Sequence, residues 1–138
     1  HQAGGSMSAD CSVYVIGFDA NKAPSKVGMA RDPVGRMASL QTAHFQKLTL
    51  AGSWTCPNRE IARALEVSFH QTQAESRLAG EWFDLAPDAG MVILMIGLGV
   101  MLNKCCGMEP AEVDAILAKS LNDHSGRFAG LLVRDAHG

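Results

Sequence analysis

Five side chains in the first 70 residues are of the types that cleave phosphodiester bonds. They are Tyr14, Lys26, Arg36, Glu66 and His70. Such cleavage requires stabilisation of negative charge on the phosphate oxygens and removal of a proton from the attacking water. A guanidinium binds two phosphate oxygens at once, and one carboxylate is enough to hold a hydrated Mg²⁺ ion. These residue types are therefore compatible with metal-assisted phosphoryl chemistry.

Each of these residues also has an ordinary structural interpretation. A tyrosine on a strand is often half-buried core, and a lysine on an edge strand often keeps the protein soluble. Glu66 and Arg63 are three residues apart and can form a helix ion pair, and His70 lies one turn beyond Glu66 on the same helix face. Only the joint pattern favours the chemical interpretation.

The elements that position these residues follow from the local sequence. Residues 12–18 and 25–29 are short and rich in β-branched or aromatic side chains, which predicts an antiparallel hairpin. Asp32-Pro33 predicts the start of a helix that runs to about Thr42. A third strand is expected over residues 47–54, and Asn58 is the expected cap of a second helix.

The second half of the chain is different in composition. Pro87 opens an apolar stretch, within which residues 91–102 are uncharged, and Glu109-Pro110 opens a further helix. The uncharged stretch is shorter than the ~20 residues that span a bilayer, so we expect no membrane segment. We expect it to be buried against the sheet or in a homodimer. The predicted fold is α+β: a three-stranded antiparallel sheet flanked by helices, with an appended C-terminal helical pair.

The charge distribution points to a nucleic-acid partner for the first part of the chain. The net charge of the chain is −2, which is a poor match to phosphate. Residues 20–80, however, hold eight Lys and Arg against four Asp and Glu, and residues 81–138 hold four against eight. We expect DNA to be held by residues 20–80. The candidate DNA-binding side chains are Lys22, Arg31, His44 and Lys47.

Several features bear on domain organisation and compartment. Residues 1–6 are polar and glycine-rich and look like an expression-tag remnant, so Met7 is the expected start. Residues 7–85 are expected to form the catalytic domain, and residues 86–138 a helical extension packed on it. The four cysteines show no spacing that suits a zinc site. Reduced thiols and the lack of a signal-peptide pattern after Met7 indicate a soluble cytoplasmic protein.

Three fragments, taken in order and spacing, resemble the GIY-YIG nuclease superfamily, and within it the small phage-type or meiotically up-regulated DNA-binding-domain branch. The first is Val13-Tyr14-Val15-Ile16, and the second is Lys26-Val27-Gly28 leading to Arg36. The third is Leu65-Glu66 to His70 with the segment from Arg77 to Phe83. The resemblance covers residues 12–85.

The resemblance implies a divalent-metal-dependent endonuclease that cleaves DNA, with single-stranded or branched DNA as the expected substrate. It implies Glu66 as the ligand of Mg²⁺ or Mn²⁺ and Arg36 as the residue that stabilises the charged transition state. Tyr14 is the expected proton acceptor, with Lys26 facing it across the hairpin and lowering its pKa. His70 is a further catalytic candidate. The alternatives are a catalytically weak DNA-binding module of the same fold and a dimerising interaction protein.

This sequence departs from the broader family at three positions. Lys26 replaces the second tyrosine, Leu40 stands where a histidine is frequent, and the late asparagine has no clear counterpart. Glu81 and Asp84 lie in the neighbourhood of that asparagine. These departures leave the identity of the general base open.

Overall fold

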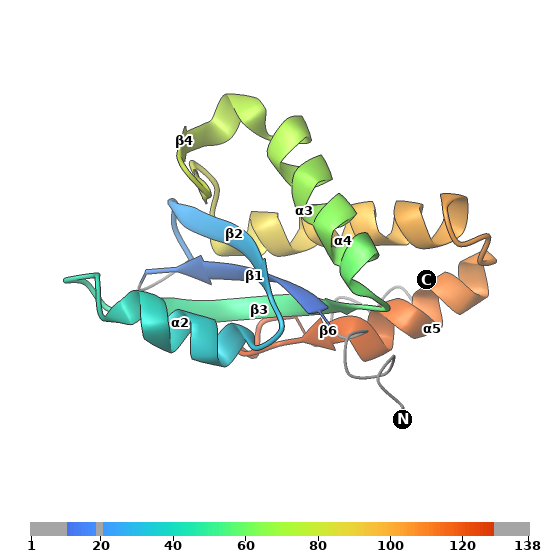
Figure 1. The fold of residues 1–138 in the computed structure, drawn as a ribbon, viewed down its shortest axis with the longest axis horizontal. Helices are drawn as coiled ribbons and strands as arrows, with labels where there is room; N and C mark the ends of the chain where they lie inside the picture. Colours follow the sequence, from blue (N-terminus) through green and yellow to red (C-terminus); the bar gives the residue numbers. More distant parts are fainter. Residues whose placement is uncertain (1–10, 19–20, 129–138) are drawn as a thin grey trace.

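A computed structural model describes residues 11–18 and 21–128 of the chain. The suspected tag remnant at residues 1–6 lies outside these ranges. The described part is α+β, as the sequence predicts, and its antiparallel sheet has the strand order β4-β5-β2-β1-β3-β6 (Figure 1). The predicted count of three strands is wrong, because three further short strands extend the sheet on both sides.

The three long strands are those that the sequence predicts. They are β1 (Cys11–Gly17), β2 (Ser25–Ala30) and β3 (Thr49–Cys56). The three additional strands are β4 (Arg77–Ala79), β5 (Trp82–Phe83) and β6 (Leu121–Asn122). Strands of two or three residues are too short to show an alternating pattern, and this is why sequence inspection missed them.

Four α-helices surround the sheet in the described residues. They are α2 (Pro33–Gln41), α3 (Arg59–Thr72), α4 (Pro87–Lys104) and α5 (Pro110–Ser120). The expected caps of the first two are present: the Asp32 side chain accepts a hydrogen bond from the Gly35 amide, and Asn58 accepts one from the Ile61 amide at 2.8 Å. Each cap satisfies one of the unpaired amides of a first helical turn, which fixes where the helix begins.

The two faces of the sheet are covered by different helices. Val13, Val15 and Val27 point into the larger core, together with buried residues of α3, α4 and α5. Tyr14 and Ile16 point to the opposite face, where Met37 and Leu40 of α2 pack against them. The alternation along β1 therefore places Tyr14 under α2, on the face away from α3 and α4 (Figure 1).

The apolar stretch at residues 91–102 lies within α4. Its fully buried residues pack in the core with the sheet and α3; they are Met91, Leu94, Leu98 and Leu102. The indole Nε1 of Trp54 donates a hydrogen bond to the Met91 carbonyl at 3.1 Å. The whole helix, longer than the uncharged stretch alone, has the length and composition of a membrane-crossing helix, with 33% of that span buried. One hydrophobic core thus contains residues from both sides of position 86, and the helical pair is part of it.

Candidate active site

The five residues with predicted catalytic roles come together at the β2 edge of the sheet. Strand β5 pairs only with Ser25 and Lys26 of β2, and the Val27 amide then donates to the Glu81 carbonyl at 3.0 Å. Beyond this point the edge of β2 is not covered by β5. Side chains from both faces of the sheet can therefore meet there.

The strand register corrects the expected relation between Tyr14 and Lys26. Tyr14 lies opposite Gly28, and Lys26 lies opposite Ile16. Both side chains are on the same face of the sheet, but they are diagonal neighbours and do not face each other directly.

Gly28 is the floor of the site. A Cβ atom at this position would lie 2.5 Å from the Tyr14 hydroxyl and 2.7 Å from Glu81 Oε1. Real Cβ atoms do not approach other atoms so closely, so the phenol and the carboxylate use space that only glycine leaves open. The Tyr14 hydroxyl and Glu81 Oε1 therefore both lie over the backbone of β2 at Gly28.

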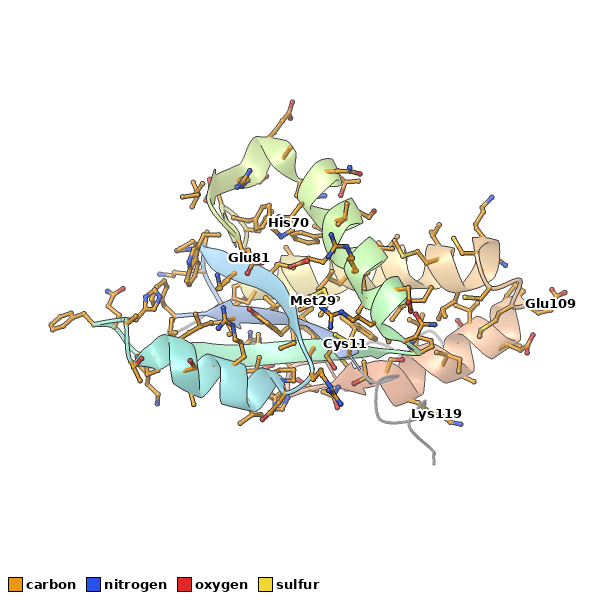
Figure 2. The ribbon with its side chains drawn as sticks, in the orientation of Figure 1. Cys11, Met29, His70, Glu81, Glu109 and Lys119 are labelled. Carbon is orange, nitrogen blue, oxygen red and sulfur yellow. The ribbon has the colours of Figure 1, made fainter. Side chains whose placement is uncertain are left out.

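Helix α3 supplies Glu66 and His70. Ala62, Leu65 and Phe69 are its buried residues, and Glu66 and His70 are half-buried on the neighbouring stripe at i and i+4. One ligand atom from each of Glu66, His70 and Glu81 lies within 4.8 Å of the others. Figure 2 shows His70 and Glu81 close together between α3 and β2.

His70 is held in a defined orientation. Its Nε2 lies 3.1 Å from the Val27 carbonyl oxygen, and its ring is edge-on to Phe83 at a centroid distance of 4.9 Å. A carbonyl oxygen only accepts hydrogen bonds, so Nε2 carries the proton in this contact. The lone pair of the neutral ring is then on Nδ1.

The environment of Glu66 keeps its carboxyl close to half-protonated at neutral pH. Burial, a hydrogen bond with Glu81 and the negative charge of Glu81 raise the pKa of Glu66 to about 7, against the opposing charges of Arg63 and Lys26. Two carboxylates this close either share a proton or bind a cation. The pair is thus suited to exchange a proton for a metal ion near neutral pH.

Tyr14 does not have the electrostatic environment that the sequence suggested. Burial raises the pKa of Tyr14 above its ordinary value, and the main opposing influence is a hydrogen bond with Arg36. Lys26 instead forms an ion pair with Glu81, with Nζ 3.2 Å from Oε1. The expectation that Lys26 lowers the pKa of Tyr14 is therefore wrong, because the ammonium of Lys26 is paired with the carboxylate of Glu81.

The candidate DNA-binding residues lie outside this cluster. Lys22 and Lys47 are exposed in the segments before β2 and β3. Arg31 is exposed after β2 and lines a pocket of about 300 Å³, together with Ser12 and Ser53 among other residues. His44 lies against aromatic rings, 6.2 Å from Phe18 and 5.7 Å from Trp82 between centroids.

Glu81 is the site residue that sequence reasoning did not select. It stands at the turn between β4 and β5, and the short β5 holds this turn against β2. The only signal in the sequence was that Glu81 lies near the position at which the GIY-YIG superfamily has an asparagine. No periodic pattern marks a residue in a turn of this kind.

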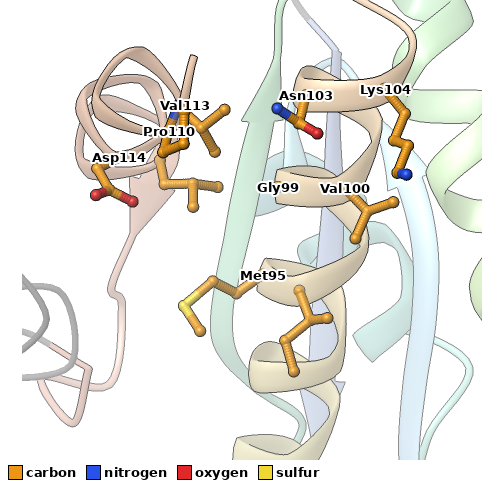
Figure 3. A pocket seen from close by; sticks show the side chains of 10 residues that line it. Met95, Gly99, Val100, Asn103, Lys104, Pro110, Val113 and Asp114 are labelled. Carbon is orange, nitrogen blue, oxygen red and sulfur yellow. The ribbon is translucent and has the colours of Figure 1, made fainter. Parts of the chain in front are cut away.

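A second feature of the surface is an apolar groove between α4 and α5. It has a volume of about 400 Å³, and Met95, Gly99, Val113 and Leu117 are among its lining residues (Figure 3). Ile96 and Val100 line it too and are 58% and 52% exposed. The groove contains none of the residues of the β2-edge cluster.

Comparisons of the chain with known protein families, with curated proteins and with solved structures gave no match.

Proposed function

We propose that the protein is a divalent-metal-dependent endonuclease that hydrolyses DNA phosphodiester bonds, with single-stranded or branched DNA as substrate. The observation that supports this best is the convergence of Tyr14 and Arg36 with the Glu66–His70–Glu81 group at one uncovered strand edge. These residues come from four separate segments of the chain, since Glu66 and His70 are both on α3. A structural ion pair needs two residues, whereas phosphoryl transfer needs such a combination of cationic, acidic and hydroxyl groups.

Arg36 is the residue that binds the phosphate. It is exposed on the first turns of α2, and its hydrogen bond with Tyr14 directs it toward the site. Its planar group donates two parallel hydrogen bonds to phosphate oxygens and stabilises the charge that develops there. The neutral phenol of Tyr14 donates a hydrogen bond beside it and orients the attacking water or the phosphate.

Glu66 and its neighbours are the residues that would hold a divalent ion. Such an ion polarises a phosphoryl oxygen and lowers the pKa of water when it is bound. Their two carboxyl groups and one imidazole are suitable donors for it. Lys26 neutralises Glu81 when no ion is present, so that the acidic pair does not repel the substrate.

The charge distribution of the chain supports DNA as the substrate. Residues 20–80, with eight basic and four acidic side chains, contain Arg36 and Lys26 as well as the candidate DNA-binding residues. Apart from Glu81, the acidic residues of 81–138 lie beyond the site in sequence. DNA would therefore approach over the basic part of the chain.

The decisive experiment compares Glu66→Gln with Glu60→Gln. Both residues are on α3, but Glu60 is exposed in its first turn and lies outside the site. We expect Glu66→Gln to abolish Mg²⁺- or Mn²⁺-dependent nicking of labelled oligonucleotides and Glu60→Gln to leave it unchanged. DNA binding should persist in both variants, because Glu66 does not hold the phosphate.

The same experiment tests the alternative of a catalytically weak DNA-binding module. If wild-type protein binds DNA but does not cleave it with any divalent ion, or if Glu66→Gln cleaves as well as wild type, the nuclease proposal is wrong. The binding module then becomes the better interpretation.

The exposed side of α4 supports a second role, self-association. Ile96 and Val100 are large, exposed and adjacent to the apolar groove. A homodimer through this part of residues 91–102 would remove that surface from water. Sedimentation velocity at micromolar concentration should show a dimer that Ile96→Asp converts to monomer; a wild-type monomer over the whole range contradicts this role.

A further inference from the structure

We infer that Glu66, His70 and Glu81 form a three-ligand site that selects a first-row transition ion, such as Mn²⁺, over Mg²⁺. The inference depends on the proposed function only for the use of the ion, because binding is measurable without DNA. It replaces the expectation of Glu66 as the sole protein ligand by a set that includes an imidazole.

The spacing of the three groups fits a common ion. Ligands bound at ~2.1 Å lie roughly 3 to 3.5 Å apart around one metal. The three ligand atoms already lie within 4.8 Å of one another. The two glutamates have three side-chain torsions each, so small rotations close the remaining distance while the backbone stays in place.

His70 is the residue that sets the preference. Its Nε2–H donates to the Val27 carbonyl, which leaves Nδ1 with the lone pair. A backbone carbonyl that orients the far nitrogen of a ligand histidine is a common outer partner in metal sites. Mg²⁺ prefers oxygen ligands, whereas Mn²⁺ and the later metals also accept imidazole.

Lys26 is the cation that competes with the ion. Its Nζ lies 3.2 Å from Oε1 of Glu81 and 5.7 Å from the centre of the Trp82 ring. An ion that binds Glu81 must repel or displace this ammonium. Removal of the ammonium is therefore expected to strengthen ion binding, which is the opposite of the effect of removing any ligand.

The test is titration of the full chain with Mn²⁺, followed by the loss of the free-ion electron paramagnetic resonance signal, with Mg²⁺ as competitor. Mn²⁺ is the probe because the adjacent exposed thiols of Cys105 and Cys106 would take up softer ions such as Zn²⁺. We expect one Mn²⁺ ion per chain at this site and at least tenfold weaker binding of Mg²⁺.

Four variants separate the ligands from their neighbours. His70→Ala should weaken Mn²⁺ binding at least tenfold and leave Mg²⁺ binding nearly unchanged, and Glu81→Gln should weaken both. Lys26→Met should strengthen both several-fold. His124→Ala is the control for a histidine elsewhere on the surface and should change neither.

A measurement on the wild-type chain keeps the inference testable if His70→Ala does not fold. Bound Mn²⁺ should broaden the nuclear magnetic resonance signals of the His70 ring before those of the His44 and His124 rings. Equal broadening, equal affinities for Mn²⁺ and Mg²⁺, or unchanged Mn²⁺ binding in folded His70→Ala would overturn the inference.

The outcomes also separate this inference from the proposed nuclease function. Selective Mn²⁺ binding without DNA cleavage would support the site and contradict the nuclease. Glu66-dependent cleavage without any preference for Mn²⁺ would support the nuclease and contradict the role of His70.

Discussion

Arg36 and Tyr14 illustrate how two side chains on opposite elements become one functional unit. Arg36 lies on α2 and Tyr14 on β1, and the hydrogen bond between them is one of the main influences on the pKa of the phenol. If Arg36 binds phosphate as proposed, this contact would orient its guanidinium before substrate arrives.

Replacement of Arg36 tests this arrangement. We expect Arg36→Ala to reduce the cleavage rate by about 10²-fold or more, because a preorganised charge at the developing anion is lost. Arg36→Lys keeps the charge but loses the planar fork and should recover only part of the rate. Single-turnover cleavage measures both; equal rates for Arg36→Lys and wild type would show that only the charge matters.

The raised pKa of Tyr14 leads to a prediction on pH dependence. A phenol with a pKa above its ordinary value of 10.0 is neutral throughout the range from pH 6 to 9. Tyr14→Phe should therefore lower the cleavage rate without moving any inflection of the pH–rate profile in this range. An inflection that disappears in Tyr14→Phe would show that the phenol is the proton acceptor after all.

Glu66 predicts how the stability of the metal-free protein changes with pH. Its pKa is raised from an ordinary value of 4.5 to about 7 in the folded chain. Between these values the folded state holds a proton that the unfolded state has lost, so the free energy of unfolding falls as the pH rises. The charged groups that set this shift are Glu81, Arg63 and Lys26.

Urea unfolding in the presence of chelator, at pH 5 to 8, measures this effect. The wild type and Glu60→Gln should lose stability relative to Glu66→Gln over this interval. The difference between the curves isolates Glu66 from other groups that titrate in the same range. Parallel curves for all three proteins would mean that the pKa of Glu66 is not raised.

At the scale of elements, α4 has one side that is buried in the core and one side that is exposed to solvent. Leu94 is completely buried between the sheet and the helices, whereas Ile96, two residues later, is 58% exposed. An α-helix turns by about 200° over two residues, so the two side chains point in opposite directions. The apolar composition of the helix hides this division, because apolar residues occur on both sides.

Aspartate substitutions distinguish the two sides. Leu94→Asp buries a carboxylate and removes a packed side chain, so it should cost about 4 kcal/mol or more and prevent stable folding. Ile96→Asp should leave the unfolding midpoint of the monomer within the usual range of a surface change. Circular dichroism and thermal melting check both, and a folded Leu94→Asp variant would contradict the packing of α4 on the sheet.

At the scale of the whole molecule, the charge is divided between a basic first part and an acidic second part. Residues 81–138 contain eight acidic and four basic side chains, the reverse of residues 20–80. If DNA is the substrate, as proposed, we expect it to contact the basic residues 20–80, although the net charge of the chain is only −2. Binding to DNA should therefore be modest and electrostatic.

Salt dependence of DNA binding tests this division. If roughly three phosphates are contacted, affinity should fall about 10- to 50-fold between 50 and 200 mM salt. Lys22→Glu and Lys47→Glu should weaken binding to unrelated sequences alike, and Lys119→Glu on α5 is the control. Affinity that does not change with salt would contradict an electrostatic interface.

The sequence by itself determined the local structure of this protein, namely where its main helices and strands begin. Proline and cap residues place the starts of α2 and α3, and the short runs of β-branched residues place β1 and β2, because these signals act within a few residues. The i, i+4 spacing of Glu66 and His70 is also a local property of a helix. All five residues expected to be catalytic lie at the β2 edge.

Only the tertiary structure decided how that edge is completed. Strands β4, β5 and β6 form because longer strands are present to pair with them. The pairing of β5 with β2 positions the preceding residue, Glu81, beside Lys26 and Glu66. The pairing of Lys26 with Glu81, and not with Tyr14, depends on the same contact. Contacts between segments distant in the chain leave no periodic trace in the sequence, because they depend on packing and burial and not on local spacing.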